Sequence, residues 1–415
     1  MNKRITPISR QDVANNIFEE KIGNRSGSSN GLESKKGAGK MKNWMISILC
    51  GMVLVWNLMA CGRQQPQTPV VSSFLTYSHS MELHYAREFS VDYYEGGYAL
   101  ITLADSERYL LVPEDKAVPE DLETDITVLQ QPLKNLYLAA SAAMDMFVAL
   151  DALPRIRFSS LKAEGWYIRE AREAMEAGTI LYAGKYAAPD YEKILEENCG
   201  LAVENTMIYH TPQVKEQLER FGIPVLVDYS SYEKEPLGRT EWVRLYGLLT
   251  GREAQAEMLF AAEQAVFESV KGDDSTGKKV AFFYITNNGE IHVRTPSDYL
   301  PKMIELAGGC YVFQNSEEES SSSTMMLQWE EFYAAAKDAD CLIYNSTVDG
   351  ELNSVDELLA KSGLLKNFKA VQEGNVFCTS RKLYQSTMSL GTITHDLHEI
   401  LAGREGNLTY FYKLE

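Results

Sequence analysis

Short apolar segments alternate with amphipathic segments along most of the chain from Leu133 onward. The apolar segments are rich in Val, Ile and Leu, as buried strands are, and the amphipathic segments carry apolar residues at helical spacing. The expected strands of the first half are Asn135–Ala140, Ile156–Phe158, Thr179–Tyr182, Leu201–Glu204 and Ile223–Val227. The expected helices are Ala142–Leu150, Tyr167–Ala177, Asp190–Glu197 and Pro212–Phe221. This alternation predicts a parallel sheet covered by helices on both faces.

The same alternation resumes at Lys279 and continues to the C-terminal region. The expected strands there are Lys279–Tyr284, Tyr311–Phe313, Cys341–Tyr344 and Asn375–Cys378. The expected helices are Ser297–Leu306, Trp329–Lys337, Ser354–Leu359 and Leu390–Leu401. Ser354 and Glu357 have the spacing of an N-terminal helix cap. The second half therefore predicts another α/β lobe.

Two helices separate these halves. The first is expected at Arg239–Leu249, and Thr250-Gly251-Arg252-Glu253 matches a capping box that begins a second helix running to about Lys271. A helix of this length is a rod of about 30 Å. The predicted fold is therefore α/β, with two Rossmann-like lobes of mainly parallel strands, 81–237 and 273–415, joined by the connecting helices of 238–272.

An extended section precedes the first helix of the N-terminal lobe. Phe89–Tyr94 and Tyr98–Leu103 flank Gly96-Gly97 and predict a hairpin, and Tyr109–Pro113 predicts a third strand.

The first eighty residues predict an export leader and an anchor. Trp44–Trp56 is an apolar run too short to span a membrane, and Leu58-Met59-Ala60-Cys61 resembles a bacterial lipobox, in which the cysteine is acylated. We expect a disordered or misassigned start, a lipoprotein signal peptide and a polar tether at 1–40, 41–60 and 61–80. The translation start is either Met1 or Met41. An ordinary secretory signal with a chance cysteine is the alternative. The predicted location is extracytoplasmic and lipid-anchored to the cell membrane, in an envelope of one membrane or two.

The charge of the exported part excludes some partners. The chain has a formal net charge of −18, and residues 1–60 hold 9 Lys+Arg and 4 Asp+Glu, so residues 61–415 carry 31 basic against 54 acidic residues, a net −23. A surface this acidic disfavours binding to nucleic acid, because the phosphates need a basic face. It also disfavours adsorption on anionic lipid. Any membrane attachment is therefore expected to come from the anchor.

Four cysteines follow the lipobox, widely separated and without a C-x-x-C pair: Cys199, Cys310, Cys341 and Cys378. Export permits two disulfides, and the apolar neighbours of each cysteine favour buried free thiols. The spacing leaves both possibilities open.

Two sequence blocks carry a family resemblance. One is Glu235-Pro236-Leu237-Gly238-Arg239-Thr240-Glu241-Trp242 leading into Leu248–Glu253, and the other is Lys302–Gly309. With them, the chain from Phe89 to Leu401 resembles the substrate-binding lipoproteins of ABC importers for iron-siderophore complexes, haem and vitamin B12. The resemblance implies a fairly rigid rod between the lobes and a monomer without enzymatic activity or a resident cofactor. It also implies capture of a metal chelate and its delivery to a permease and ATPase.

The same resemblance implies a permease-docking glutamate in each lobe. Glu192-Lys193-Ile194 matches the start of the first family segment, although Cys199-Gly200 replaces the usual Pro-Asp. In the second lobe the match falls on Glu330, with Glu331 as the rival because the spacing is slightly longer. Both glutamates could instead be first-turn acids stabilised by the helix dipole.

Ligands of open α/β sheets bind at the carboxyl ends of the strands, which selects two sets of facing loops. In the first lobe these are Ser159–Ile168, Ala183–Pro189, Asn205–Thr211 and Asp228–Glu235; in the second they are Thr286–Pro296, Gln314–Thr324, Asn345–Gly350 and Thr379–Thr387. Aromatic rings suit a macrocycle or catecholate, and cations suit carboxylates or an anionic chelate. The expected ligand-binding residues are Trp166, Lys185, Tyr186, Tyr209, Tyr229, Arg294, Arg381 and Tyr384, with Tyr232 in the same loops. Arg239 could bind ligand or tie the rod to a lobe.

The sequence gives little support for a metal site or an enzyme active site. His395-x-x-His398 and the pair His210 and His292 are possible metal ligands, but no metal site is predicted. From Ser80 onward there is no Gly-x-Ser-x-Gly elbow, phosphate-binding glycine loop or His-Glu-x-x-His motif. The alternatives to an importer component are an extracellular α/β enzyme and a chelate scavenger without a permease.

Overall fold

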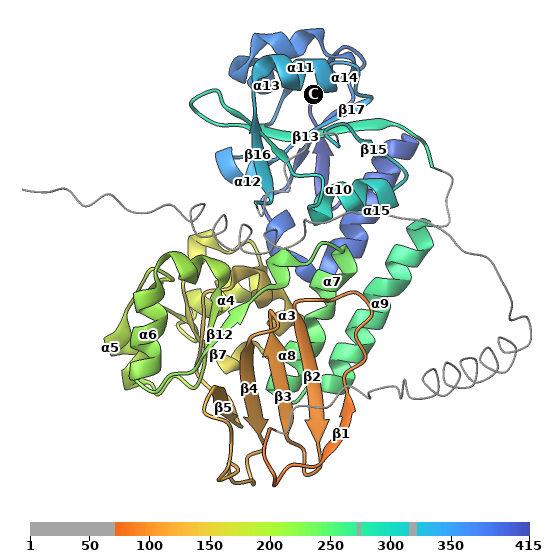
Figure 1. Ribbon diagram of the computed structural model, residues 1–415. Helices are drawn as coiled ribbons and strands as arrows, with labels where there is room; N and C mark the ends of the chain where they lie inside the picture. Colours follow the sequence, from red (N-terminus) through yellow and green to blue (C-terminus); the bar gives the residue numbers. More distant parts are fainter. Residues whose placement is uncertain (1–70, 272–274, 315–321) are drawn as a thin grey trace, which may run out of the picture. The chain divides into compact units, whose positions relative to one another are not determined.

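The structure is a computed structural model that describes residues 71–271, 275–314 and 322–415 (Figure 1). Pro69–Glu415 forms one compact unit. The expected leader, the expected acylation site Cys61 and the first ten residues of the predicted tether lie outside the described residues. Among the described helices, none combines the length and the apolar character that a membrane span requires.

A five-stranded sheet precedes the first lobe. Its strands, in spatial order, are β1 (Tyr77–Ser80), β2 (Phe89–Tyr94), β3 (Ala99–Leu103), β4 (Glu107–Val112) and β5 (Ile126–Gln130). The predicted hairpin and third strand are confirmed as β2, β3 and β4, which pair antiparallel. The tether was predicted too long: Val71 is buried, and the backbone N–H of Ser73 donates to Asp121 at 2.8 Å. The chain therefore joins the folded unit by residue 71.

The N-terminal lobe contains a parallel sheet in the order β12-β11-β6-β7-β8. Its strands are β6 (Leu136–Leu138), β7 (Ile156–Ser159), β8 (Leu181–Tyr182), β11 (Ala202–Asn205) and β12 (Val225–Asp228). Its helices are α3 (Met144–Ala149), α4 (Arg169–Glu176), α5 (Tyr191–Glu196) and α6 (Pro212–Arg220). Alternate strand residues enter separate cores, because Leu136 and Leu138 pack with α3 whereas Tyr137 packs with α5 and α6. The predicted doubly covered parallel sheet is confirmed.

The connecting region consists of three helices, α7 (Pro236–Glu241), α8 (Val243–Thr250) and α9 (Glu253–Lys271). The single helix predicted at Arg239–Leu249 is thus divided at Trp242. The capping-box prediction is wrong: Thr250 is the last residue of α8, and its hydroxyl donates to the Tyr246 carbonyl at 2.7 Å. Gly251, with φ of +71°, ends α8 in the left-handed conformation that glycine adopts without strain. The 19-residue α9 is the predicted rod and packs against α8 and α15 (Leu390–Ala402).

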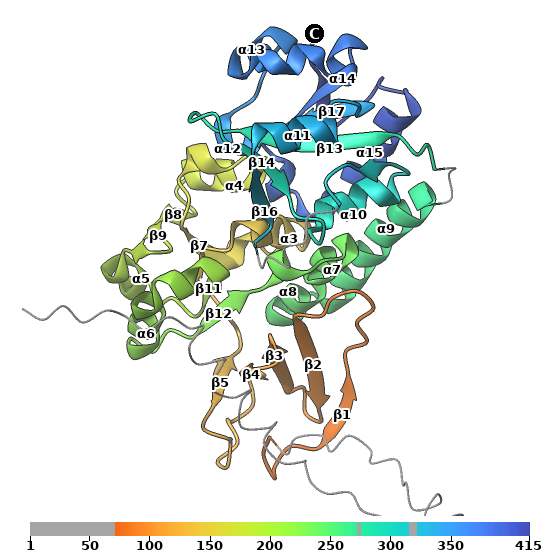
Figure 2. The same ribbon diagram turned by 45° about the horizontal axis from the view of Figure 1, so that its top comes forward.

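The C-terminal lobe contains a seven-stranded mixed sheet, in the order β16-β14-β13-β17-β18-β19 with β15 paired to β13. The strands are β13 (Lys279–Ile285), β14 (Ile291–Arg294), β15 (Cys310–Tyr311), β16 (Thr324–Leu327), β17 (Cys341–Tyr344), β18 (Val376–Thr379) and β19 (Phe411–Lys413). Figures 1 and 2 place α11 (Trp329–Ala336), α13 (Val355–Lys361) and α14 (Lys369–Gln372) on one side of it, and α10 (Tyr299–Leu306) and α15 on the other.

Three antiparallel strands of this sheet were missed. β14 and β16 occupy parts of the predicted loops Thr286–Pro296 and Gln314–Thr324, and β19 follows the last predicted helix. Each is only three or four residues long. β17 and most of β13 are continuous apolar runs that indicate buried strands, whereas β14 and β19 mix polar with apolar residues. Among the described cysteines, Cys199, Cys341 and Cys378 are buried free thiols and Cys310 is an exposed one.

Helix α7 ties the N-terminal sheet to both lobes. The buried Glu241 carboxylate accepts the backbone N–H groups of His84, Tyr85 and Ala86 at 2.8–3.0 Å, in the loop between β1 and β2. Just before α7, the buried Glu233 accepts the N–H groups of Arg87 and Glu88 and the Trp242 indole N–H at 3.0 Å. These carboxylates supply the acceptors that the loop lacks, so the motif that carries the family resemblance is a structural junction.

We expect Glu241→Gln to destabilise the full chain by about 2–4 kcal/mol, because the amide replaces one acceptor oxygen with a donor facing backbone donors. The free energy of unfolding in urea measures this. Glu257→Gln is the matched control: Glu257 also pairs with Arg244 but is 53% exposed, and it should cost less than about 1 kcal/mol. Equal losses in the two variants would contradict the junction.

Candidate functional site

The two lobes make direct contact through the segment 381–388, which follows β18 and leads to α15. The Gln385 side chain accepts the backbone N–H of Tyr167 and donates to the Gly165 carbonyl, both at 2.8 Å. The Thr387 hydroxyl donates to the Ala142 carbonyl at 3.0 Å. We call this segment the strap. It connects the C-terminal lobe to the loops after β6 and β7, so strand ends of both lobes meet here, as the sequence predicted.

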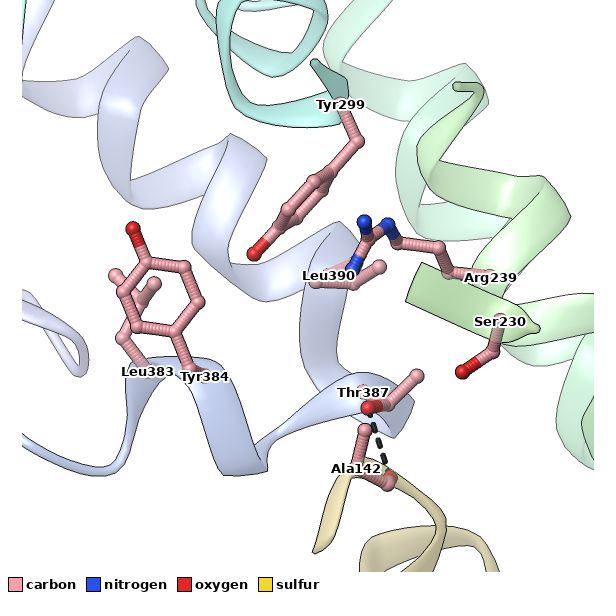
Figure 3. Close-up of a pocket in the computed structure, with 8 residues that line it drawn as sticks. All are labelled: Ala142, Ser230, Arg239, Tyr299, Leu383, Tyr384, Thr387 and Leu390. Atoms are coloured by element: carbon pink, nitrogen blue, oxygen red, sulfur yellow. Dashed lines mark hydrogen bonds between the residues drawn. The ribbon is translucent and has the colours of Figure 1, made fainter. Parts of the chain in front are cut away.

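A cavity lies between the strap, α7 and α10 (Figure 3). Its walls come from both lobes and from the connecting helices: Ala142, Ser230, Arg239, Tyr299, Leu383, Tyr384, Thr387 and Leu390. The space open to the centre of a water molecule is only about 20 Å³. That is room for one or two waters or one small polar group.

Arg239, Tyr299 and Tyr384 line this cavity, and Arg294 lies next to both tyrosine rings without lining it. The Arg239 guanidinium carbon lies 3.7 Å from the centre of the Tyr299 ring, a close cation–π contact. The Arg294 guanidinium carbon lies 5.9 Å from the same ring and 5.3 Å from the Tyr384 ring. Burial raises the pKa of Tyr299 and Tyr384, and the nearby arginines offset this only in part, so both hydroxyls keep their protons at neutral pH.

Arg239 and Arg294 make different contacts. Arg294 is 9% exposed and forms a bidentate ion pair with Asp298, with both N–O distances at 2.9 Å. Its charge is therefore already compensated within the lobe. Arg239 donates from Nε and Nη2 to the Glu233 and Ser231 carbonyls. Arg239 therefore ties α7 to the 231–233 loop and also lines the cavity, while ligand binding by Arg239 stays a prediction.

The remaining predicted ligand residues divide into three groups. Trp166 is fully buried, and its indole N–H donates to Ser159 at 3.0 Å, so it belongs to the core and lines no open space. Tyr209, Tyr229 and Tyr232 form a partly exposed aromatic cluster, with ring centres 6.0–6.2 Å apart. The hydroxyl of Tyr209 contacts that of Tyr229 and donates to Glu107.

The third group lies at the outer part of the loops. Lys185 is exposed on β9 (Gly184–Lys185), and the half-buried Tyr186 packs against the α5 and α6 core. Arg381 is exposed on the strap, where it pairs with Glu351 at 3.5 Å and approaches the Tyr167 hydroxyl of the other lobe at 3.5 Å. Of the predicted residues, only Tyr384 lines the cavity itself.

The cavity residues with a polar side chain that sequence reasoning missed are Ser230, Tyr299 and Thr387. Ser230 and Thr387 lay inside predicted loops but are neither aromatic nor cationic. Tyr299 sits in the first turn of α10, where an aromatic residue normally indicates core packing. Its position under Arg239 depends on how α7 and α10 meet, which no local pattern encodes.

The predicted docking glutamates lie where the sequence placed them. Glu192 is exposed in the first turn of α5, and Glu330 and Glu331 are exposed in the first turn of α11. Within the described ranges none of the three forms an ion pair. First-turn acids are favoured by the helix dipole, so this placement fits both interpretations.

Two half-buried carboxylates accept hydrogen bonds at the junction of the strap and α15. Asp145 on α3 accepts the Met388 N–H at 2.8 Å, and Glu263 on α9 accepts the Gly391 N–H at 3.0 Å. Burial raises the pKa of Asp145 to about 6 and that of Glu263 to about 7. The negative charge of Asp145 adds to the shift of Glu263, which indicates that the two carboxylates are close.

Known proteins resemble this chain in sequence and in fold. No family model matches the chain. Two lipoproteins of Methanocaldococcus jannaschii, both named uncharacterized, are similar in sequence. One is 24% identical over 371 residues, covering 83% of this chain and 87% of its own. The other is 19% identical over 349 residues, covering 80% and 87%.

Three solved structures are similar in fold. The periplasmic haem-binding protein HutB of Vibrio cholerae has a TM-score of 0.53 at 16% identity, covering 64% of this chain and 99% of its own. The catecholate-siderophore binding protein VctP of the same species has 0.51 at 15%, covering 66% and 94%. A possible iron-binding protein of Staphylococcus epidermidis has 0.51 at 14%, covering 65% and 99%.

The chain has the class III periplasmic binding fold. The predicted fold class, two α/β lobes joined by a long helix, is confirmed by these structures and by the separate sheets of the two lobes. In the class III arrangement of this chain, the cavity lies where the lobes meet, lined by strand-end loops and by α7. Identities this low establish a shared fold, and the ligand has to be argued from the site.

We expect Asp145→Asn to stabilise the protein above about pH 6 and to have no effect near pH 4. The folded protein keeps the Asp145 proton up to about pH 6, whereas an unfolded chain releases it near pH 4. Wild-type stability therefore falls as the pH rises through this window. Because Asp145 is partly exposed, we expect a gain of only about 1–2 kcal/mol at pH 7.5.

Urea denaturation of the full chain from pH 4.5 to pH 7.5 measures this difference. Asp338→Asn, at a 74% exposed carboxylate, is the control and should give no pH-dependent difference from the wild type. A difference for Asp145→Asn that stays constant across the pH range would show that its pKa is not raised.

Proposed function

We propose that this protein is a lipid-anchored, extracytoplasmic solute-binding protein that captures an iron complex, either a siderophore or haem, or cobalamin between its lobes. It delivers the ligand to the permease and ATPase of an ABC importer. The observation that carries this proposal is the cavity built jointly by strand-end loops of two α/β lobes. Ligands of open α/β sheets bind at that position.

The chemistry of the site favours an iron chelate. Arg239, Tyr299 and Tyr384 line the cavity, and flat rings and guanidinium groups suit catecholates, carboxylates and macrocycles. Two similar structures are titled as haem-binding and catecholate-siderophore binding proteins. The lipoprotein names of the similar archaeal proteins support acylation of Cys61.

A whole chelate is larger than the cavity, so binding requires the strap to move. Movement breaks the hydrogen bonds of Gln385 and Thr387 to the other lobe. Each such bond contributes only about 1 kcal/mol net, which contacts to the ligand can replace. The exposed or half-buried rings and cations of the outer loops are then available to the bulk of the ligand: Lys185, Tyr186, Tyr209, Tyr229 and Arg381.

The test is a binding panel on the purified full chain in detergent: a ferric tris-catecholate, a ferric trihydroxamate, haem and cobalamin. We expect at least one compound to bind with 1:1 stoichiometry by titration calorimetry. Tyr384→Ala should weaken that ligand at least tenfold because it removes a cavity wall and the cation–π partner of Arg294.

Tyr98→Ala is the matched control, because Tyr98 lies in the N-terminal sheet and donates only to the Ala117 carbonyl. It should leave the affinity unchanged. If no compound on the panel binds and the protein instead turns over a substrate, the enzyme alternative replaces this proposal. If the protein binds a compound, but a strain that lacks its gene takes up that compound at the normal rate, the scavenger alternative is favoured.

For permease docking, we expect Glu192→Ala and Glu330→Ala to reduce uptake of the labelled ligand by whole cells at least fivefold. The affinity of the purified protein should be unchanged, because both carboxylates are exposed and outside the cavity. Glu331→Ala tests the rival position, and Glu216→Ala, at an exposed acid of α6, is the control. Loss of ligand affinity in the purified Glu192 or Glu330 variant would refute the docking role.

A further inference from the structure

Some hydrogen-bond donors in the cavity between the lobes have no acceptor among the described residues. Tyr299 is 3% exposed, and its hydroxyl has no hydrogen-bond partner among the described residues. Figure 3 shows this hydroxyl pointing into the cavity toward Tyr384. The Tyr384 oxygen accepts a hydrogen bond from Asn345 at 3.3 Å, which leaves its own proton to be donated.

Arg239 adds charged donors to the same space. Its Nε and Nη2 groups are used by the Glu233 and Ser231 carbonyls, and within the described chain its Nη1 group has no partner. The side chain is held flat over Tyr299 at 3.7 Å and lines the cavity. Its orientation is therefore fixed before any ligand arrives, which lowers the entropy cost of binding.

The nearby carboxylates cannot satisfy these donors. Asp298 already accepts hydrogen bonds from Nε and Nη2 of Arg294 and from the Leu300 N–H. Asp228 is occupied by the Tyr246 hydroxyl and by Ser230. The missing component of this site is an acceptor, and a negatively charged acceptor would satisfy the tyrosine donors and the arginine together.

We propose that this cavity is a carboxylate subsite. A carboxylate oxygen accepts from Tyr299 and from Arg239 Nη1, and its second oxygen accepts from Tyr384. The small volume admits one such group and excludes a whole chelate. This inference deepens the proposed function: the ligand carries at least one free carboxylate, as haem propionates and carboxylate siderophores do. A free small carboxylate would offer the same chemistry.

The experiment has two arms, both on the purified full chain. In the first arm, thermal unfolding is followed in citrate or acetate against sodium chloride of equal ionic strength. We expect the carboxylates to raise Tm by a few degrees in the wild type and not in Tyr299→Phe, which keeps the ring under Arg239 and loses only the hydroxyl. Tyr333→Phe, on α11 at the other side of the sheet, is the matched control and should respond as the wild type does.

In the second arm, calorimetry compares haem with its dimethyl ester, and ferric citrate with a ferric trihydroxamate that lacks carboxylates. We expect Tyr299→Phe and Arg239→Lys to weaken at least one carboxylate-bearing compound about tenfold and to leave its carboxylate-free counterpart unchanged. The two arms distinguish a carboxylate that belongs to the chelate from a free small carboxylate. The affinity for the chelate depends on Tyr299 only if the chelate itself carries the carboxylate.

The failures of the two proposals are distinguishable. If a chelate binds, but esterification and Tyr299→Phe change nothing and citrate does not stabilise, the carboxylate subsite is refuted and the solute-binding function stands. If no chelate binds, but citrate stabilises the wild type and not Tyr299→Phe, the subsite stands and the solute-binding function is refuted. Equal weakening of all compounds by Tyr299→Phe would show a purely structural role and would also refute the subsite.

Discussion

The hydrogen bonds that the Glu241 carboxylate accepts from the 84–86 loop are the constraint on which the rest of the structure depends. They fix α7 against the N-terminal sheet, and Glu233, just before the start of α7, accepts backbone N–H groups of the same loop. Gly238 lies between them because an added Cβ would approach the Tyr85 carbonyl and Glu233 at 3.2 Å. Once α7 is fixed, Arg239 and Thr240 on the same helix are aimed at the C-terminal lobe.

This junction explains how a structural motif also builds the cavity between the lobes. Arg239 reaches the cavity while its remaining nitrogens hold the 231–233 loop. The Thr240 hydroxyl donates to the Thr387 carbonyl of the strap at 3.2 Å. The strap is therefore held from three directions: by α7, by the loops after β6 and β7, and by the carboxylates of Asp145 and Glu263 near the start of α15.

The electrostatics of the site oppose those of the surface. Residues 61–415 carry a net charge of −23, yet the cavity contains an arginine whose free end faces donor hydroxyls. A positive group inside an acidic protein creates a local field that selects the anionic end of a ligand. The ion pair of Arg294 and Asp298 lies beside the wall residues Tyr299 and Tyr384 and adds no net charge. In the proposed carboxylate subsite, the uncompensated positive charge is that of Arg239, the residue whose role the sequence left open.

The sequence by itself determined the two α/β lobes, the rod and the positions of the exposed glutamates, because apolar periodicity and helix length are local properties. It also predicted that strand-end loops would meet. Only the tertiary structure decided which side chains share the cavity. Trp166 and Tyr299 are both aromatic residues near strand ends, yet Trp166 packs in the core and Tyr299 faces Arg239. Residues brought together from α7, α10 and the strap are far apart in sequence, so only the packing of these elements could identify the site.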